Sequence, residues 1–331
     1  MLRSRDEIEN GEMVDEIEVR VLDAHQGPTT SLAWKLTVED QAENKFDVKI
    51  WYTHDVDVHI REGWRYVLHD GRGRKWDHSE ITLQSTSDFS VTRPEGVVEL
   101  LALGDSHIGR ENRPKNTGAP YRTARQFLTA MGYAARYDVD AVVHAGDCFD
   151  DNPTATDCMI AENGFDILAQ SDIPFLFIYG NHGVSTAKSF FDRLTDVELC
   201  HLGTEGITVG DTIELFGIDN GSEASVLDAA SNFGSSQIAG NQLLVVHNEI
   251  APPRLKNGVS LSALFERAGM TFDCLLAGHI HNCESAESKG AKIQHLGSTA
   301  ELSTVRGAVH NSAWLVRIAS GEVSLQRITI S

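Results

Sequence analysis

Long apolar runs and paired cysteines are both missing from this 331-residue sequence. No run approaches the ~18 apolar residues that a membrane-spanning helix needs, and the first twelve residues are polar and charged, unlike a signal peptide. The five cysteines are odd in number and contain no Cys-x-x-Cys pair, which fits reduced thiols better than a disulfide framework. We therefore expect a cytoplasmic protein with no membrane association.

Lysine is also scarce, and acidic residues exceed basic ones by 48 to 28, giving a net charge of −20. Taken alone, such acidity argues against nucleic acid as a partner, because phosphates repel it. The alternative is a surface adapted to concentrated salt, in which repulsion is screened over a few ångströms. We hold this halophilic interpretation as a hypothesis, and it leaves DNA open as a partner.

The chain is expected to divide near Thr92–Gly96, where Arg93-Pro94-Glu95-Gly96 interrupts two strand-like runs. We expect a flexible acidic N-terminus over residues 1–12, an all-β domain over 13–93 and a second domain over 97–331. Short alternating runs separated by turn residues fill the all-β part, and their number fits a small OB-like barrel better than a sandwich. The runs are Glu16–Leu22, Leu32–Val38, Phe46–Trp51, Arg65–His69 and Glu80–Gln84.

Strands and helices alternate after the boundary, which indicates an α/β domain, here with an antiparallel end. Helical spacing occurs in Ala119–Tyr137, Asp157–Gln170 and Lys188–Leu194. The expected strands are Val97–Leu103, Ala141–Ala145, Pro174–Tyr179, Ile213–Ile218, Leu243–Val246, Cys274–Ala277, Lys292–His295, Ala313–Ile318 and Glu322–Ile328.

Potential metal ligands follow five of these apolar strands, and in four cases a glycine comes first. In α/β sheets, ligands bind outside the carboxyl ends of the strands, and glycine lets the backbone turn sharply there. Carboxylate, imidazole and amide oxygen together suit Mn, Fe or Zn, rather than a calcium cage or a thiolate zinc site. The motifs are Gly104-Asp105-Ser106-His107, Gly146-Asp147-Cys148-Phe149-Asp150, Gly180-Asn181-His182, His247 and Gly278-His279-Ile280-His281.

Each motif alone is more typical of a solvated turn, and Gly-His-Ile-His alone could also be a polar strand face or a surface metal site. Independent turns would not all follow strands in this order with these side chains. The set therefore predicts a two-metal centre, in which a pair of ions stabilises the entering and leaving oxygens of a displacement at phosphorus.

The ordered motifs GDSH, GDCFD, GNH, a lone histidine after a strand and GHIH closely resemble those of the calcineurin-like metallophosphoesterases, over about Val97 to Ser331. Within that class the chain is similar to the DNA double-strand-break repair exonucleases. That finer likeness lies in Asp-Ser-His-Ile-Gly before a long helix, in Gly146–Asp150, and in the tail His295-Leu296-Gly297-Ser298-Thr299.

The resemblance implies a four-layer αββα sandwich that hydrolyses DNA, single-stranded or at strand ends, in DNA repair. It implies two divalent metal ions, with Mn²⁺ preferred and Zn²⁺, Fe or Mg²⁺ as alternatives. By this resemblance the first ion is held by Asp105, His107 and His281, the second by Asn181, His247 and His279, and Asp147 bridges both.

His182 is implied to stabilise the transition state and protonate the leaving oxygen, with Asp150 orienting it. An imidazole beside two cations needs such a carboxylate to stay positioned and protonated. One departure is Gly183, where the family commonly has an acidic residue. It puts the local orientation of His182 in doubt but not the metal ligands.

Basic residues gather just after the first ligand pair, in Gly109–Arg125, with Glu111 as the one acid. They could steer a phosphate backbone into the site, or simply pair with the acidic surface. The basic residues are Arg110, Arg113, Lys115, Arg122 and Arg125.

Aromatic and basic residues interleave in the barrel region, as in OB folds that stack bases of single strands. Its run Phe46–Trp51 is similar to a strand of replication-protein-A-type domains. We expect Trp51 in the core and Trp76, beside Arg72, Arg74 and Lys75, as the stacking residue. A protein-docking or purely structural barrel remains the alternative.

Two rival functions stay open at this point. One is a phosphatase or small-molecule phosphodiesterase with the same dinuclear site, and the other is a non-catalytic scaffold tethered to DNA by the barrel. The sequence leaves open exonuclease or endonuclease action, polarity, DNA or RNA, and any protein partner or homo-oligomer.

Overall fold

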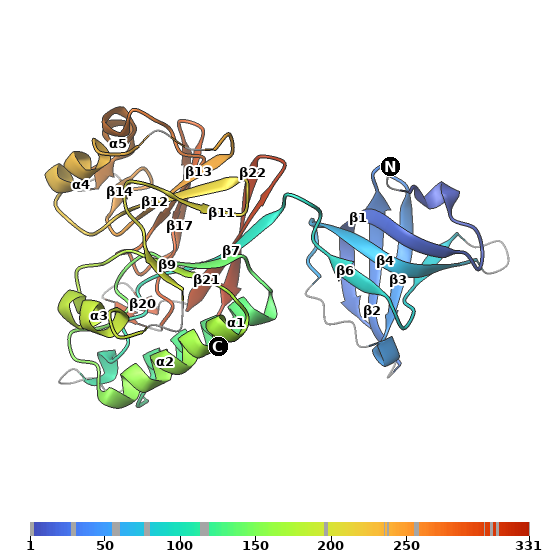
Figure 1. The fold of residues 1–331 in the computed structure, drawn as a ribbon, viewed down its shortest axis with the longest axis horizontal. Coiled ribbons are helices and arrows are strands. Elements are labelled where there is room, and N and C mark those ends of the chain that lie inside the picture. The colour runs from blue at the N-terminus through green and yellow to red at the C-terminus, as the bar shows by residue number, and fades with distance from the viewer. Residues whose placement is uncertain are drawn as a thin grey trace. The chain divides into compact units, whose positions relative to one another are not determined.

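The computed structural model divides the chain into two compact units, Met1–Val97 and Val98–Ser331 (Figure 1). It describes residues 3–27, 31–54, 60–75, 80–112, 119–194, 198–234, 236, 238–254, 258–300, 302–304, 307–308 and 311–330. Among these, no helix is long and apolar enough to cross a bilayer.

The first unit is a closed β-barrel of five strands. The strands run in the order β1-β2-β3-β5-β4, β1 also pairs with β4 and so closes the barrel, and β3 lies parallel to β5. A short β6 adds to β4. The bounds are β1 Met13–Gln26, β2 Leu32–Asp40, β3 Lys45–Trp51, β4 Arg65–Arg74, β5 Thr82–Gln84 and β6 Ser90–Thr92.

Residues before the barrel pack against it, although we expected them to be flexible. Ile8 is buried in the barrel core, which removes an apolar side chain from water. The carboxylate of Asp40 is buried and accepts hydrogen bonds from Ser4 Oγ at 2.8 Å and from the Arg5 backbone N–H at 2.7 Å. Because a buried carboxylate needs donors, these bonds hold the described part of the N-terminal segment on the barrel.

The second unit contains two six-stranded sheets that confirm the mixed α/β fold. The first has the order β10-β9-β8-β7-β21-β22, in which β10 to β7 are parallel and β21 and β22 are antiparallel. Its bounds are β7 Val98–Leu103, β8 Ala141–His144, β9 Phe175–Phe177, β10 Leu199–His201, β21 Ser312–Ala319 and β22 Glu322–Thr329.

The second sheet has the order β11-β12-β13-β16-β18-β17, with parallel central strands and antiparallel edges. Its bounds are β11 Ile207–Val209, β12 Ile213–Ile218, β13 Asn241–Val246, β16 Cys274–Ala277, β17 Glu284–Ser288 and β18 Ala291–His295. Two pairs of very short strands lie outside both sheets, β14 Ile250–Ala251 with β15 Val259–Ser260, and β19 Ser303–Thr304 with β20 Gly307–Ala308.

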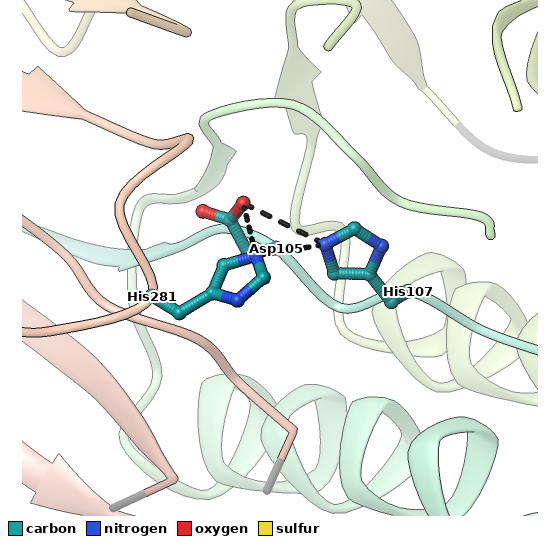
Figure 2. Close-up of side chains that lie close together, drawn as sticks. All are labelled: Asp105, His107 and His281. Atoms are coloured by element: carbon teal, nitrogen blue, oxygen red, sulfur yellow. Dashed lines mark hydrogen bonds and ion pairs between the residues drawn. The ribbon is translucent and has the colours of Figure 1, made fainter. Parts of the chain in front are cut away.

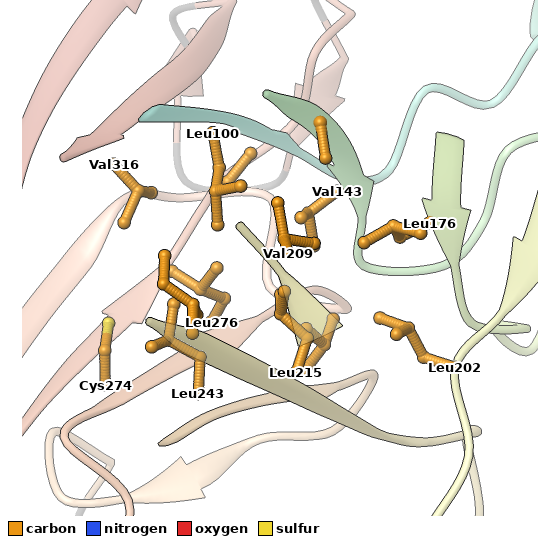
Figure 3. Packing of buried hydrophobic residues seen from close by; sticks show 14 of the residues in the cluster. Leu100, Val143, Leu176, Leu202, Val209, Leu215, Leu243, Cys274, Leu276 and Val316 are labelled. Atoms are coloured by element: carbon orange, nitrogen blue, oxygen red, sulfur yellow. The ribbon is translucent and has the colours of Figure 1, made fainter. Parts of the chain in front are cut away.

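The two sheets pack face to face through one apolar core. Leu100 and Val143 of the first sheet meet Leu215, Leu243 and Leu276 of the second (Figure 3). Interdigitated apolar side chains of this kind fix how two sheets align.

Helices cover the outer face of each sheet (Figure 1). Phe127 and Phe165 of two long helices pack on Phe175 of the first sheet, and Leu264 and Val226 of two short helices pack on the second. The helix bounds are α1 Arg122–Arg136, α2 Ala155–Gln170, α3 Val184–Phe191, α4 Glu223–Ala230 and α5 Leu261–Ala268, with 3-10 turns η1 Arg5–Glu7, η2 Tyr52–His54 and η3 Arg110–Asn112.

Candidate metal centre

The loops that carry the expected ligands leave the carboxyl ends of β7, β8, β13 and β16, with a further loop just after β9. Four of the expected ligands have left-handed backbone, with φ of 50° at Asp105, 45° at His107, 54° at Asp147 and 73° at His279. Each such residue costs on the order of 1–3 kcal/mol and persists only where its surroundings hold it. The left-handed backbone at these four residues therefore indicates loops whose conformation is maintained by their surroundings, as occurs at functional sites.

Asp105, His107 and His281 form the first cluster of side chains (Figure 2). Nε2 of His107 lies 3.2 Å from Nε2 of His281, and Oδ1 of Asp105 lies 3.5 Å from the latter nitrogen. Asp105 is fully buried, and its Oδ1 has no hydrogen-bond partner within the part of the chain that the structure describes. A buried carboxylate oxygen facing two imidazole nitrogens is an arrangement that a cation satisfies.

Asn181, His247 and His279 form the second cluster. Oδ1 of Asn181 lies 3.2 Å from Nε2 of His247 and 2.9 Å from Nδ1 of His279. Asp147 stands between the clusters, since its Oδ2 lies 3.6 Å from Nε2 of His107 and 3.2 Å from Nε2 of His247. The structure thus brings together all seven side chains that the sequence singled out as ligands.

In two of these histidines, the ring nitrogen that does not face the other ligands makes a hydrogen bond to the protein. Nδ1–H of His107 donates to Oδ1 of Asp150 at 3.1 Å, and Nδ1–H of His247 donates to the carbonyl of Ala145 at 2.6 Å. Such outer bonds fix the tautomer and aim Nε2 at the site. Oδ1 of Asp150 also lies 3.5 Å from Nη1 of Arg110.

His182 lies beside the first cluster, with its ring centroid 5.2 Å from that of His107. Its backbone N–H donates to Oδ1 of Asp147 at 2.8 Å, and its side chain is 32% exposed. Asp151, which the sequence analysis did not single out, has its Oδ1 3.5 Å from Nδ1 of His182. The resemblance assigned the orienting role to Asp150, whereas the carboxylate found at ion-pair distance here is that of Asp151.

Gly183 has a conformational reason to replace the usual acidic residue. It caps the start of α3 with a φ of 57°, and a Cβ there would lie 2.8 Å from the carbonyl oxygen of Phe149. A side chain at this position would therefore meet both a left-handed backbone and a steric overlap.

The electrostatics of the site favour a bound cation. Burial lowers the pKa of His107, but the carboxylates of Asp105 and Asp150 outweigh burial and raise that pKa to about 9. Burial would raise the pKa of Asp105, yet the His107 and His281 imidazoles outweigh it and hold this pKa well below its usual range. The buried carboxylates of Asp105 and Asp150 thus favour positive charge in the site. The donor set of carboxylate, imidazole and amide oxygen fits two divalent ions of the Mn, Fe or Zn type.

Three of the four glycines that precede ligands are required by close packing. A Cβ at Gly180 would lie 2.5 Å from the backbone N of Asp147, and a Cβ at Gly278 would lie 2.7 Å from Nδ1 of His247. Gly146 has a φ of 88° and would place a Cβ 2.8 Å from Cγ of His247. At Gly104 the nearest atom would be 3.5 Å away, which is an ordinary contact.

The basic residues expected to contact nucleic acid are partly described. The side chain of Arg110 is 25% exposed beside Asp150. Nε of Arg122 lies 3.8 Å from Oε1 of Glu111. In the barrel, Arg72 and Arg74 are exposed at the end of β4, and Lys75 follows them. Outside the described residues lie Arg113, Lys115 and Trp76.

Comparison with known proteins agrees with this geometry. The family model "Calcineurin-like phosphoesterase superfamily domain" matches residues 98–320. A DNA double-strand break repair protein Mre11 from Methanosarcina mazei is 29% identical over 209 residues, covering 61% of this chain and 33% of that protein. The Mre11 of Haloferax volcanii is 28% identical over 213 residues, covering 62% and 46%. The chain therefore spans a third to a half of the length of these relatives.

Among solved structures, a dimetal phosphatase from Danio rerio aligns with a TM-score of 0.46 and 15% identity, covering 71% of this chain and 99% of that one. This likeness is too weak to add to the assignment.

Proposed function

Since the chain belongs to the calcineurin-like phosphoesterase superfamily, we propose that it is a metal-dependent nuclease that cleaves DNA, single-stranded or at strand ends, in DNA repair. At the coarser level it is a hydrolase acting on phosphoester bonds. The proposal rests above all on the meeting of the Asp105 cluster and the Asn181 cluster on either side of Asp147. The Mre11 relatives support DNA as the substrate.

The seven clustered side chains hold two divalent ions in this proposal, with Mn²⁺ preferred. Asp105, His107 and His281 would hold the first, Asn181, His247 and His279 would hold the second, and Asp147 would contribute to both. When bound, such a pair polarises the phosphate and activates a water for in-line attack. Asp150 holds His107 through its Nδ1 and so fixes the direction of Nε2.

His182 is the proton donor in this mechanism. Its side chain is partly exposed beside the first cluster, where a bound phosphodiester can reach it. Oδ1 of Asp151 lies 3.5 Å from Nδ1 of His182 and so helps to hold the orientation of the ring. His182 then gives its proton to the sugar oxygen as the bond to phosphorus breaks.

The barrel over residues 13–93 is assigned to the OB fold. Its strand order, its closure between β1 and β4 and its parallel β3–β5 pair support this assignment. The domain over residues 97–331 is assigned to the four-layer αββα class, because two sheets share one core and helices cover both outer faces.

The outer face of β2 and β3 is our candidate surface for single strands. Lys35 lies directly opposite Lys49 in the strand pairing, and Trp51 follows two residues along the same face. Trp51 was expected in the core, but Phe46, Val48 and Ile50 point inward, and alternation therefore turns Trp51 outward. Cations beside an aromatic ring suit the phosphates and bases of a single strand.

A salt-adapted surface reconciles DNA binding with the net charge of −20. In molar salt, the repulsion between an acidic surface and phosphates is screened within about 3 Å.

The test is cleavage of end-labelled single- and double-stranded DNA in MnCl₂ and molar KCl, beside p-nitrophenyl phosphate esters. We expect DNA cleavage that EDTA abolishes and that His182→Ala slows strongly. His201→Ala is the matched control, because this histidine also pairs with an aspartate, Asp219 at 2.9 Å, on the same domain. Activity confined to the small esters would identify a phosphatase or small-molecule phosphodiesterase, and DNA binding without any hydrolysis would identify a scaffold.

A further inference from the structure

The two side chains that face each other in the first cluster come from different sheets. Asp105 follows β7 of the first sheet, and His281 follows β16 of the second. Their Oδ1 and Nε2 atoms lie 3.5 Å apart. No strand pairing among the described residues joins these two sheets. The spacing of these ligands therefore depends on the shared core and on contacts between the two loops, one of which is the hydrogen bond from the backbone N–H of His279 to Oδ2 of Asp105 at 2.9 Å.

Ser298 makes further contacts with both loops. This residue is fully buried in the loop after β18. Its hydroxyl donates to the carbonyl of Asp105 at 2.7 Å, and its backbone N–H donates to the carbonyl of His281 at 3.2 Å. One residue thus hydrogen-bonds to the main chain of both ligands.

Thr299 reinforces the attachment on the side of the first sheet. Its hydroxyl donates to the carbonyl of Gly104 at 2.9 Å, and its backbone N–H donates to the same oxygen at 3.0 Å. Thr299 is fully buried as well. The carbonyl oxygens of Gly104 and Asp105 are therefore both held by this short segment.

Gly297 brings the segment close to the loop of the second sheet. Its φ is 74°, and a Cβ there would lie 2.7 Å from Sγ of Cys283 and 3.2 Å from the carbonyl of His281. The backbone N–H of Ser312, at the start of β21, also donates to the carbonyl of Ser298 at 3.0 Å. The segment is thus fixed on both sides.

The backbone that Ser298 holds is strained. Asp105 and His107 have φ of 50° and 45°, a conformation that non-glycine residues keep only when contacts maintain it. We propose that Ser298 and Thr299 are positioning residues for the first metal ion, which tie the Asp105 loop to the His281 loop and set the spacing of its ligands. This inference rests on the two-metal site of the proposed function.

The predicted effect is selective for one of the two ions. Loss of an outer hydrogen bond to a ligand commonly weakens metal affinity about 10–100-fold. Ser298 contacts the main chain of two first-cluster ligands. Of the second-cluster ligands, Asn181 and His247 leave other strand ends, whereas His279 shares the loop after β16 with His281. Ser298→Ala should therefore weaken binding of the first ion about 10–100-fold and weaken the second, of whose ligands one, His279, shares this loop, to a much smaller extent.

The experiment is titration of the metal-free full chain with Mn²⁺, followed by calorimetry and by the electron paramagnetic resonance signal of a coupled Mn pair. Wild type should bind two ions and show the coupled signal. Ser298→Ala should bind one ion tightly and show an uncoupled signal at Mn²⁺ concentrations that saturate wild type. Thr299→Val, which keeps shape but removes the second hydroxyl, should act in the same direction and serves if Ser298→Ala fails to fold.

Ser324→Ala is the matched control. Its hydroxyl donates to the carbonyl of Arg317 at 3.3 Å. In the strand register, Arg317 lies opposite Glu99, near the start of β7, whereas Asp105 follows the other end of that strand. It should bind both ions as wild type does.

Two ions bound normally by Ser298→Ala and Thr299→Val, or both ions weakened equally, would overturn the positioning role while leaving the proposed function intact. A wild-type chain that binds fewer than two ions would instead overturn the two-metal site, and the positioning role with it.

Discussion

Substituting Gly180 by alanine tests whether Asp147 lies between two ions. The backbone of Gly180 is not left-handed, so alanine is conformationally allowed there. Its Cβ, however, would lie 2.5 Å from the backbone N of Asp147 and closer still to Oδ1 of that carboxylate. The obstacle is therefore overlap with the proposed bridging ligand, and relief requires Asp147 or the Asn181 loop to move.

The size of that movement sets the expected effect. An ordinary contact begins near 3.4 Å, so the overlap is relieved by a shift of about 1 Å. A displacement of about 1 Å in a catalytic group can lower the rate about 100-fold, which corresponds to about 2.7 kcal/mol. Overpacking costs a further ~1–3 kcal/mol of unfolding free energy.

Gly104→Ala provides the comparison, because its Cβ would meet its nearest atom, Cβ of Ala145, at 3.5 Å. This variant should cleave DNA within about twofold of wild type and gain up to about 1 kcal/mol of stability from the less flexible unfolded chain. Mn²⁺ affinity, cleavage rate and thermal midpoint are measured for both variants. Wild-type affinity and rate in Gly180→Ala would refute the place given to Asp147, and equal damage in both variants would refute the steric argument.

Further predictions concern the proton donor, acid stability, the barrel face and salt. His182→Ala should lower kcat about 10²–10⁴-fold while leaving the Kd for DNA unchanged in anisotropy measurements. Burial lowers the pKa of His144 to about 3, so between that pH and about 6.5 the unfolded chain binds a proton that the folded chain does not, and stability falls as pH falls through this window. Urea unfolding should show a shallower loss from pH 7 to pH 4.5 in His144→Leu than in wild type. Trp51→Ala should weaken binding of oligo-dT by about 1–3 kcal/mol, and an unchanged Kd would remove the β2–β3 face from consideration. Unfolding midpoints should rise steeply between 0.2 M and 3 M KCl, whereas full stability in dilute buffer would contradict salt adaptation.

The clustering of the seven proposed ligands could be predicted from sequence because its signals are local. A strand that ends in glycine and then a ligand places that ligand at a sheet edge, and parallel neighbours share that edge. The structure adds a steric reason for the pattern, since Gly146, Gly180 and Gly278 each approach Asp147 or His247 too closely for a side chain. Gly104 follows the same pattern without that constraint, which shows that the motif alone does not distinguish required glycines from permitted ones.

The helices α4 and α5 were not predicted, although each begins at a serine cap, Ser222 and Ser260. Eight residues give only about two helical turns, too few to establish a 3.6-residue period, and such short helices draw their stability from tertiary packing. That packing is on the second sheet, through residues such as Val226 and Leu264, and depends on long-range contacts that sequence spacing does not contain.

Trp51 shows the opposite case, in which the sequence held the answer. Phe46, Val48 and Ile50 already defined the inward face of a strand with period two, which places Trp51 beside Lys49 on the other face. Its size and apolar character favoured the core instead, yet large aromatic residues are also those that a binding face uses.

The carboxylate beside His182 lay beyond such local rules. Asp150 and Asp151 are adjacent in sequence, and their side chains diverge toward His107 and His182. Which one meets which imidazole depends on how the loop after β8 crosses between loops from β7 and β9.

The alignment of the two sheets could not be predicted from sequence either. Parallel pairing within a sheet places its strand ends at one edge, but the spacing of the motifs does not determine how one sheet lies on the other. That alignment comes from side chains such as Leu100 and Leu276 in the shared core and from the buried hydroxyl of Ser298. Residues with no metal-binding chemistry therefore decide whether Asp105 and His281, 176 positions apart, can act on one ion.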